Sequence, residues 1–210
     1  MSFRQKLLNV PAVEDSLSGR STSISISGIH ALNGNKITPP FLDEMDSLIV
    51  GMGCFWGAER VFWKLDGVWA TAVGYSGGHT PNPTYEEVCS GLTGHAEVVL
   101  VVYQKEILGL DELLKVFWEN HDPTQGMRQG NDIGTQYRSG LWLVEEDQRN
   151  IAEKTLQDYE KSLNQSGFGN ITTSIEGQQT FYYAEEHHQQ YLYKNPSGYC
   201  GIGGTGVSCN

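Results

Sequence analysis

The order of apolar patterns after Leu48 constrains the fold more than any other feature of this chain. Short apolar runs of strand length alternate with segments whose apolar residues recur every three or four positions, as in amphipathic helices. The predicted strands cover 48–52, 68–75, 95–103, 137–144 and 171–176, and the predicted helices cover 55–65, 85–89, a stretch with Asp111 as its N-cap, and 145–163. This order contains a βαββαβ arrangement, which favours a ferredoxin-like two-layer α+β sandwich with a mixed sheet over a doubly wound sheet.

The composition changes at both ends of this pattern. Residues 1–46 are rich in serine and turn signals, with a short alternating piece at 22–29, so we expect an extended N-terminal arm that lies on the domain. Residues 47–194 are predicted to form the α+β domain, and residues 195–210 a flexible, glycine-rich C-terminal tail. A length of 210 residues suits one domain with two such extensions.

The charge balance restricts the classes of partner. The chain has 14 basic and 25 acidic residues, a net charge of −11, which argues against nucleic acid or an anionic membrane as the main partner. No apolar run approaches the roughly 18 residues of a membrane span. Residues 1–13 lack the apolar core of a secretory signal. We therefore expect a cytoplasmic location. As a separate prediction, we expect a monomer.

One cysteine lies where the first predicted strand meets the first predicted helix. In Gly-Met-Gly-Cys-Phe-Trp-Gly, residues 51–57, Cys54 would stand at the helix start, where amides and the macrodipole favour the reactive thiolate. Phe55 and Trp56 would add an aromatic wall beside the sulfur. The alternative is a buried cysteine that behaves as a small hydrophobe. The flanking glycines favour the reactive role, because they let a ligand approach the backbone closely.

Glu97 is the second informative residue. It lies in the run Ala-Glu-Val-Val-Leu-Val-Val, residues 96–102, and shares a strand face with Val99 and Val101. Burial there would raise the pKa of its carboxyl, and a neutral carboxylic acid can donate a proton or a hydrogen bond near pH 7. The alternative is a glutamate at the strand edge with its carboxylate in water.

Several polar residues are ambiguous on their own. Tyr85 follows a proline-rich loop and Tyr137 follows a Gly/Asn/Asp-rich loop, positions that suit phenols at the mouth of a pocket. Asp132, in the second loop, is also typical of a turn. His187 and His188 could act as bases, but the run Glu-Glu-His-His-Gln-Gln is more typical of a solvated helix face.

The four cysteines, Cys54, Cys89, Cys200 and Cys209, form no C-x-x-C pair and have no zinc-site spacing, so we expect no metal site. The tail at 201–206 matches G-x-G-x-x-G, but no strand precedes it and no helix follows, which excludes a dinucleotide site. Cysteines on a glycine-rich tail could instead swing towards a reactive sulfur and resolve an oxidised intermediate. A disordered terminus is the alternative.

Seven segments, taken in order, resemble the methionine sulfoxide reductase A family, the peptide-methionine (S)-S-oxide reductases. They are Gly-Cys-Phe-Trp-Gly at 53–57 and the segments 74–78, 81–85, 94–97, 118–123, 134–139 and 198–204. The resemblance runs from about residue 46 to the end, and a longer form of the family carries an N-terminal arm. It implies repair of methionine oxidised in proteins or free, without a bound cofactor or metal, and with thioredoxin as the reductant.

The resemblance also implies roles for single residues. Cys54 would attack the sulfoxide sulfur, while Glu97, helped by Tyr85 and Tyr137, would protonate or hydrogen-bond the sulfoxide oxygen. The pocket would be completed by residues that hold the methyl group or line the walls, namely Phe55, Trp56, Asp132 and His188.

The remaining cysteines would regenerate the enzyme. Cys200 would resolve the sulfenic acid of Cys54 as a disulfide, and Cys209 would exchange into that disulfide, while Cys89 has no role. In family members with three such cysteines, Gly-Ile-Gly-Gly-x-Gly-Val separates the last two, and here Ser208 adds a residue. Two other hypotheses remain from the residues alone: a thiol peroxidase, and a non-catalytic redox-sensing or methionine-binding module.

Overall fold

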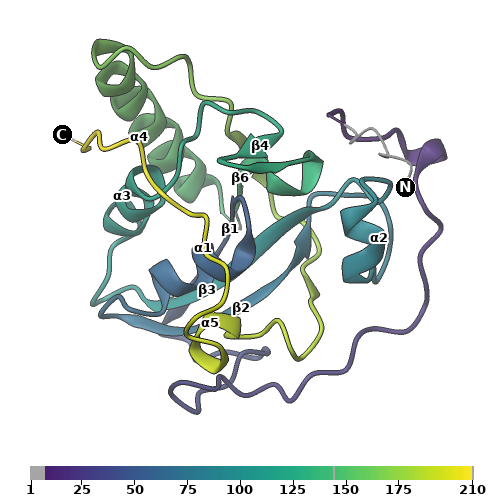
Figure 1. The fold of residues 1–210 in the computed structure, drawn as a ribbon. Coiled ribbons are helices and arrows are strands. Elements are labelled where there is room, and N and C mark those ends of the chain that lie inside the picture. Colours follow the sequence, from purple (N-terminus) through teal and green to yellow (C-terminus); the bar gives the residue numbers. More distant parts are fainter. Residues whose placement is uncertain (1–7, 144, 210) are drawn as a thin grey trace.

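The centre of the molecule is a six-stranded mixed sheet with the strand order β7-β6-β1-β3-β2-β8 (Figure 1). The computed structural model describes residues 8–143 and 145–209. Neighbouring strands pair antiparallel, except β6 and β7, which are parallel. The strands are β1 (Met45–Met52), β2 (Val68–Ser76), β3 (Ala96–Gln104), β6 (Ser139–Leu143), β7 (Ser174–Gly177) and β8 (Tyr182–Tyr183).

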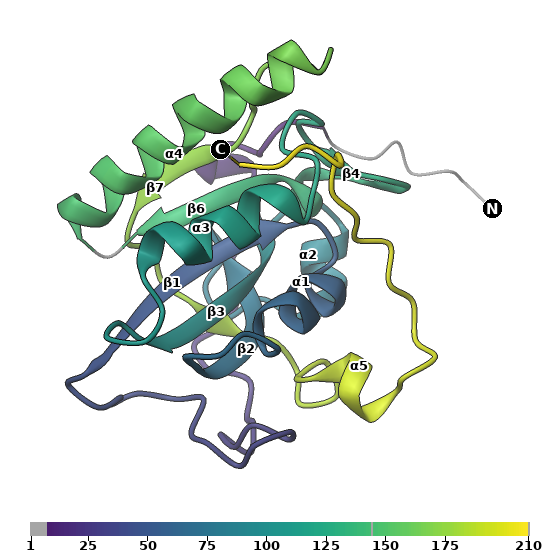
Figure 2. The same ribbon diagram turned by 90° about the vertical axis from the view of Figure 1, so that its left-hand side faces the viewer.

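Three helices cover one face of this sheet (Figures 1 and 2). They are α1 (Phe55–Phe62), α3 (Leu110–Glu119) and α4 (Glu146–Gln165). Their apolar stripes bury Phe62, Phe117 and Tyr159, among others, in one core cluster that also contains residues of β1 and β3. The shorter elements are η1 (Val13–Asp15), α2 (Tyr85–Cys89), β4 (Arg128–Gln129), β5 (Asp132–Ile133), η2 (Thr135–Tyr137) and α5 (Tyr191–Lys194). Among the described residues, no helix has the length and apolar character needed to cross a bilayer.

The N-terminal segment covers the opposite face of the sheet. Ile26, Ile37 and Phe41 pack there in a second apolar cluster with Trp142 and Val98. Because both faces are covered, β3 is buried over all but its last residue. This explains why its sequence is apolar on both faces.

The predicted βαββαβ frame is confirmed. It consists of β1, α1, β2, β3, α3 and β6, and its four strands lie in the order β6-β1-β3-β2. Strand β3 separates β1 from β2 and is antiparallel to both, so β1-α1-β2 is a split βαβ unit. The chain is therefore an α+β sandwich of the ferredoxin-like kind, extended by β7 and β8.

Some predicted boundaries are wrong. Helix α3 begins at Leu110 with Gly109 as its N-cap, and Asp111 lies in the first turn, where its carboxylate favours the helix through the macrodipole. Tyr137 is part of η2, and the strand predicted from there begins only at Ser139. The predicted end of that strand, residue 144, lies outside the described residues, as do residues 1–7 of the arm and residue 210 of the tail. The two-residue strands of the β4–β5 hairpin are too short to show a period.

The C-terminal tail runs from α5 across α1 to the gap between α3 and α4 (Figures 1 and 2). Ile202, Val207 and Cys209 pack against the main core cluster. The tail therefore runs from the start of α1 to the position where α3 and α4 lie side by side.

Candidate active site

Cys54 lies at the junction of β1 and α1, as predicted, and is the N-cap of the helix. The backbone N–H groups of Trp56 and Gly57 donate hydrogen bonds to its sulfur. The tight turn before it needs a glycine, because Gly53 has φ +91° and a Cβ there would lie 2.6 Å from Gln129. The backbone thus fixes the sulfur at the first turn of α1.

The expected thiolate at Cys54 is wrong for the resting protein. Burial raises the pKa of this thiol well above its ordinary range, and the charges of Glu97 and Asp132 add to the effect. The two helix amides lower the pKa, in the predicted direction, but desolvation is the larger effect. Cys54 is therefore a thiol at neutral pH.

Glu97 is buried in β3, with 1 % of its surface exposed. Burial raises the pKa of its carboxyl to about 8, as the sequence predicted. Its Oε2 accepts a hydrogen bond from the N–H of Phe55 at 3.0 Å, while Oε1 is buried with no hydrogen-bond partner. At neutral pH the Glu97 side chain is therefore a carboxylic acid. It is bound to the backbone of Phe55, the residue after Cys54, and its Oε1 is free to bind a ligand.

Aromatic rings surround Phe55. Its ring centroid lies 5.9 Å from that of Tyr75, 6.4 Å from that of Tyr85 and 5.3 Å from that of His188. Trp56 is fixed from two sides, since its Nε1 donates to His188 Nδ1 at 3.0 Å and its ring stacks on Tyr191 at 4.0 Å. Rigid rings beside a sulfur and an acid suit a small apolar group such as a methyl.

Tyr85 and Tyr137 both lie near Glu97. Burial raises the pKa of each phenol well above its ordinary range, and the charge of Glu97 is the next cause in both. Both remain hydrogen-bond donors across the physiological range. Cys89, which is exposed on α2, makes a hydrogen bond with Tyr85.

Asp132 faces the same site from β5. It accepts a hydrogen bond from Tyr199 Oη at 3.2 Å, and its charge acts on both Cys54 and Glu97. The structure thus brings Asp132 towards the site, and it adds Tyr199, which no sequence pattern distinguished.

His188 does not lie on a solvated helix. Residues 186–190 form turns, and His188 is 3 % exposed, with its pKa lowered to about 4 by burial. It is therefore neutral, and because Nδ1 accepts from Trp56, its proton is on Nε2. The neighbouring glutamines are buried because they bind the backbone: Gln189 Oε1 accepts from Val73 N at 3.0 Å and Nε2 donates to Val73 O at 2.8 Å.

Two buried or half-buried carboxylates that the sequence did not reveal support this region. Glu185 accepts from Tyr75 Oη and from the N–H of Tyr85, both at 2.9 Å. Glu59 of α1 is fully buried, and burial raises its pKa to about 7. Apolar periodicity in the sequence predicts the burial of apolar side chains only. It could not reveal these two carboxylates, because they are buried where they accept hydrogen bonds from polar groups.

Glu59 is the centre of a buried network that reaches the N-terminal arm. It accepts from Thr71 Oγ1 at 3.0 Å and from Gln190 N at 2.9 Å. Thr71 Oγ1 is 3.0 Å from Nε2 of His30, a residue of the arm. The network joins the arm, β2, α1 and the turn that holds His188.

The structure brings Cys200 to the same end of α1. A Cβ on Gly57 would lie 3.2 Å from Cys200 Sγ and 2.9 Å from Ile202, so a glycine is required for this approach. The N–H of the same glycine donates to Cys54, so the two sulfurs share Gly57 as a neighbour. None of the four cysteines forms a disulfide here.

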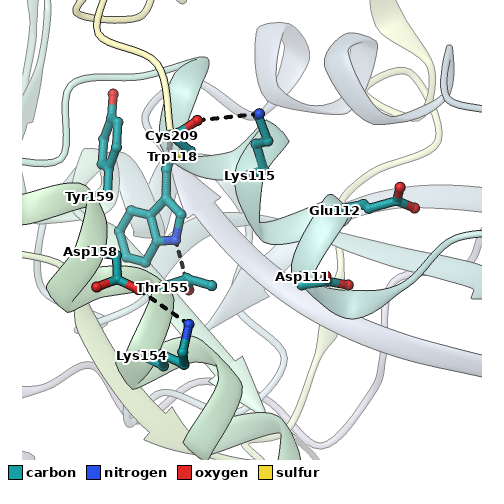
Figure 3. Close-up of a pocket in the computed structure, with 9 residues that line it drawn as sticks. All are labelled: Asp111, Glu112, Lys115, Trp118, Lys154, Thr155, Asp158, Tyr159 and Cys209. Atoms are coloured by element: carbon teal, nitrogen blue, oxygen red, sulfur yellow. Dashed lines mark hydrogen bonds and ion pairs between the residues drawn. The ribbon is translucent and has the colours of Figure 1, made fainter. Parts of the chain in front are cut away.

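Cys209 is held elsewhere, between α3 and α4 (Figure 3). Its N–H donates to Glu119 Oε1 at 2.7 Å and its carbonyl accepts from Lys115 Nζ at 3.3 Å. It lines a cavity of about 200 Å³, together with Trp118 and Tyr159. Burial and the charge of Glu119 raise its pKa to about 11, and Lys115 opposes the shift.

Substitutions of Glu119 and Lys115, the two charged residues that contact Cys209, should change the reactivity of its thiol in opposite directions. Glu119→Gln removes the charge that raises the pKa, so alkylation of Cys209 at pH 8 should become faster, by about fivefold for an effect of roughly 1 kcal/mol. Lys115→Met should slow it by a similar factor. Mass mapping of labelled peptides measures both, with Cys89 as internal control. Equal rates in both variants would contradict the electrostatic account.

No group of three or more His, Cys, Asp or Glu side chains forms a metal site within the described part of the chain. The groups that the described site offers for chemistry are thiols, a carboxylic acid and phenols. A soft nucleophile beside a neutral acid and aromatic rings can remove an oxygen atom from a small group that is otherwise apolar, which reduces the atom that carried the oxygen.

The comparisons with known proteins agree with this chemistry. A family model described as peptide methionine sulfoxide reductase matches residues 46–206. MsrA of Rhodospirillum centenum is 56% identical over 99% of this chain and 94% of its own length. The human mitochondrial peptide methionine sulfoxide reductase is 58% identical over 96% of this chain and 86% of its own. The solved structure of methionine sulfoxide reductase A of Corynebacterium diphtheriae is 41% identical, with TM-score 0.82, and the match covers 96% of this chain and 98% of that one.

Proposed function

The chain belongs to the peptide methionine sulfoxide reductase family and reduces methionine sulfoxide, and we propose that the S epimer is its substrate and Cys54 its nucleophile. The observation that carries this proposal is the protonated Glu97, whose buried Oε1 has no partner. A sulfoxide oxygen can accept the hydrogen bond that this acid is able to donate.

Three contacts position the substrate in this proposal. Its methyl group packs against Phe55 and Trp56, its oxygen faces Glu97, and its sulfur faces Cys54. Three fixed contacts on a chiral sulfur distinguish the two epimers, because exchanging oxygen and methyl would bring a polar atom onto the aromatic wall. Tyr85 and Tyr137 donate further hydrogen bonds to the oxygen, while Asp132 and His188 hold the pocket around it.

The first step converts the sulfoxide to a thioether. The Cys54 sulfur bonds to the substrate sulfur as Glu97 protonates the sulfoxide oxygen, and the proton lost by the thiol restores the acid. The substrate S–O bond and the new S–S bond then break, the hydroxyl group transfers to the Cys54 sulfur as a sulfenic acid, and methionine leaves. In sum, one thiol and one sulfoxide give one sulfenic acid and one thioether. The high pKa of Cys54 supports this coupling, because the thiol proton is still present to be transferred.

The later steps return Cys54 to the thiol. Cys200 attacks the sulfenic acid to give a disulfide and water, which prevents further oxidation. Cys209 then leaves its position between α3 and α4 and exchanges into that disulfide. Thioredoxin, a dithiol reductant, reduces the disulfide that results. The approach of Cys200 to Gly57 supports the first of these steps.

Turnover of each purified epimer with a dithiol tests the substrate. We expect release of methionine from the S epimer and none from the R epimer. Reduction of only the R epimer, or of neither, would refute the proposal, and rapid reduction of hydrogen peroxide alone would favour a thiol peroxidase. Replacing the dithiol by thioredoxin and its reductase tests the partner.

The cellular location and the oligomeric state stay predictions. We propose a cytoplasmic monomer that works on oxidised proteins and on free methionine sulfoxide. Cell fractionation checks the location, and light scattering of the full chain checks the monomer; a mass of two chains would contradict it.

A further inference from the structure

We propose that Arg60 is a catalytic residue of the disulfide step, where its guanidinium stabilises the negative charge on the Cys200 sulfur as that sulfur attacks the Cys54 sulfenic acid. This inference rests on the proposed function, because it assigns a residue to the step that follows methionine release.

The first observation is the partner of Arg60. Its Nη2 donates to Cys200 Sγ at 2.7 Å. No carboxylate forms an ion pair with this guanidinium within the residues that the structure describes, although the chain has 25 acidic residues. A guanidinium without a carboxylate, placed on a sulfur, stabilises the anionic form of that sulfur.

The second observation is the place of Arg60 on α1. It follows Gly57 by three residues, so the two lie on the same side of the helix. Gly57 provides the space that Cys200 Sγ occupies, and its N–H donates to the Cys54 sulfur. One turn of α1 therefore contacts both reacting sulfurs. Gly57 contacts the sulfurs of Cys54 and Cys200, and Arg60 places its guanidinium on the sulfur of Cys200.

The tail is also held on either side of Cys200. Tyr199 Oη donates to Asp132 Oδ2 at 3.2 Å, and Ile202 contacts the Cβ position of Gly57. These contacts fix the backbone, while Arg60 fixes the side chain. A nucleophile held in this way loses little freedom when it reacts.

The step balances in atoms and electrons. The Cys200 thiolate attacks the Cys54 sulfur, the S–S bond forms and the S–O bond breaks. The hydroxide leaves as water with a proton from the Glu97 carboxylic acid, and the proton that Cys200 lost to solvent on ionising is the one that Glu97 regains. Cys200 is oxidised and the sulfenic sulfur of Cys54 is reduced.

Single-turnover reactions with methionine-S-sulfoxide and no reductant test the inference. Arg60→Met should release one methionine per enzyme at the wild-type rate, because Arg60 contacts neither Cys54 nor Glu97. Its disulfide between Cys54 and Cys200 should form about tenfold more slowly or worse, since only a few per cent of a free thiol is ionised at pH 7. A dimedone trap, with mass mapping, should then find the sulfenic acid on Cys54.

Two further variants complete the test. Arg60→Lys keeps a cation and should restore part of the disulfide rate. Lys64→Met removes a cation from the exposed turn after α1 and should leave both rates unchanged. A wild-type disulfide rate in Arg60→Met would overturn the inference, as would equal slowing of both steps. Failure of the wild-type enzyme to release methionine would instead overturn the proposed function.

Discussion

Glu97→Gln is expected to slow methionine formation by about 10²- to 10⁴-fold, the range that a general acid contributes. Glutamine keeps the shape of the side chain and can still accept from the N–H of Phe55, but it has no proton to transfer to the sulfoxide oxygen. Substrate affinity should change little, because the aromatic wall is intact. Rapid-quench measurement of methionine release at saturating sulfoxide gives the rate directly.

The matched control is Glu106→Gln, which makes the same change at an exposed position. It should keep the wild-type rate. A Glu97→Gln enzyme with a near-normal rate would remove Glu97 from the chemistry. In the wild type, the rate should fall as pH rises through about 8, where the acid loses its proton, and the variant should lack this limb.

The same substitution should change the pH dependence of stability. Folding raises the pKa of Glu97 from 4.5 to about 8, so between these values the folded protein keeps a proton that the unfolded chain loses. The free energy of unfolding therefore falls with rising pH in this window, by about 1.4 kcal/mol per pH unit from this group. Urea unfolding at several pH values should show a shallower fall in Glu97→Gln than in the wild type.

Cys54→Ser is expected to abolish methionine formation below detection, even with excess dithiol. A hydroxyl is a far weaker nucleophile than a thiol towards sulfur, and no second thiol occupies its place at the helix start. The variant should fold normally, because serine also serves as an N-cap. Measured together, the circular dichroism spectrum and single-turnover methionine yield separate loss of chemistry from loss of fold.

Residual turnover in Cys54→Ser would mean that Cys200 or Cys209 attacks the substrate directly. The double variant Cys54→Ser/Cys200→Ser distinguishes these two sources. Complete loss in the single variant, together with one methionine per enzyme in Cys200→Ser without reductant, agrees with the proposed order of the cysteines.

Sequence patterns predicted the parts of the molecule that depend on regular burial. The βαββαβ frame follows from apolar periodicity, and the high pKa of Glu97 follows from its apolar neighbours in β3. The protonation state of Cys54 could not be predicted in the same way. It depends on whether burial raises the pKa of the thiol more than the two amide hydrogen bonds lower it. The extent of burial is set by residues that are distant in the sequence.

The burial of certain polar side chains could not be predicted from the sequence either. His188 and Gln189 are spaced like residues of a solvated face, yet they are buried because their hydrogen-bond partners come from α1 and β2. The contact of Arg60 with Cys200 joins residues 140 positions apart. Pairings of this kind have no local period, so only the folded structure reveals them.

The buried network around Glu59 gives the N-terminal arm a part in substrate affinity. His30 of the arm closes one side of this network, and Gln190 closes the other, two residues after His188. Removing the arm would admit water to a carboxyl whose pKa burial now raises to about 7, and the charged form would then draw Gln190 and its turn towards solvent. Trp56 would then lose its hydrogen-bonded support, so an enzyme without the arm would show a raised KM before any loss of kcat.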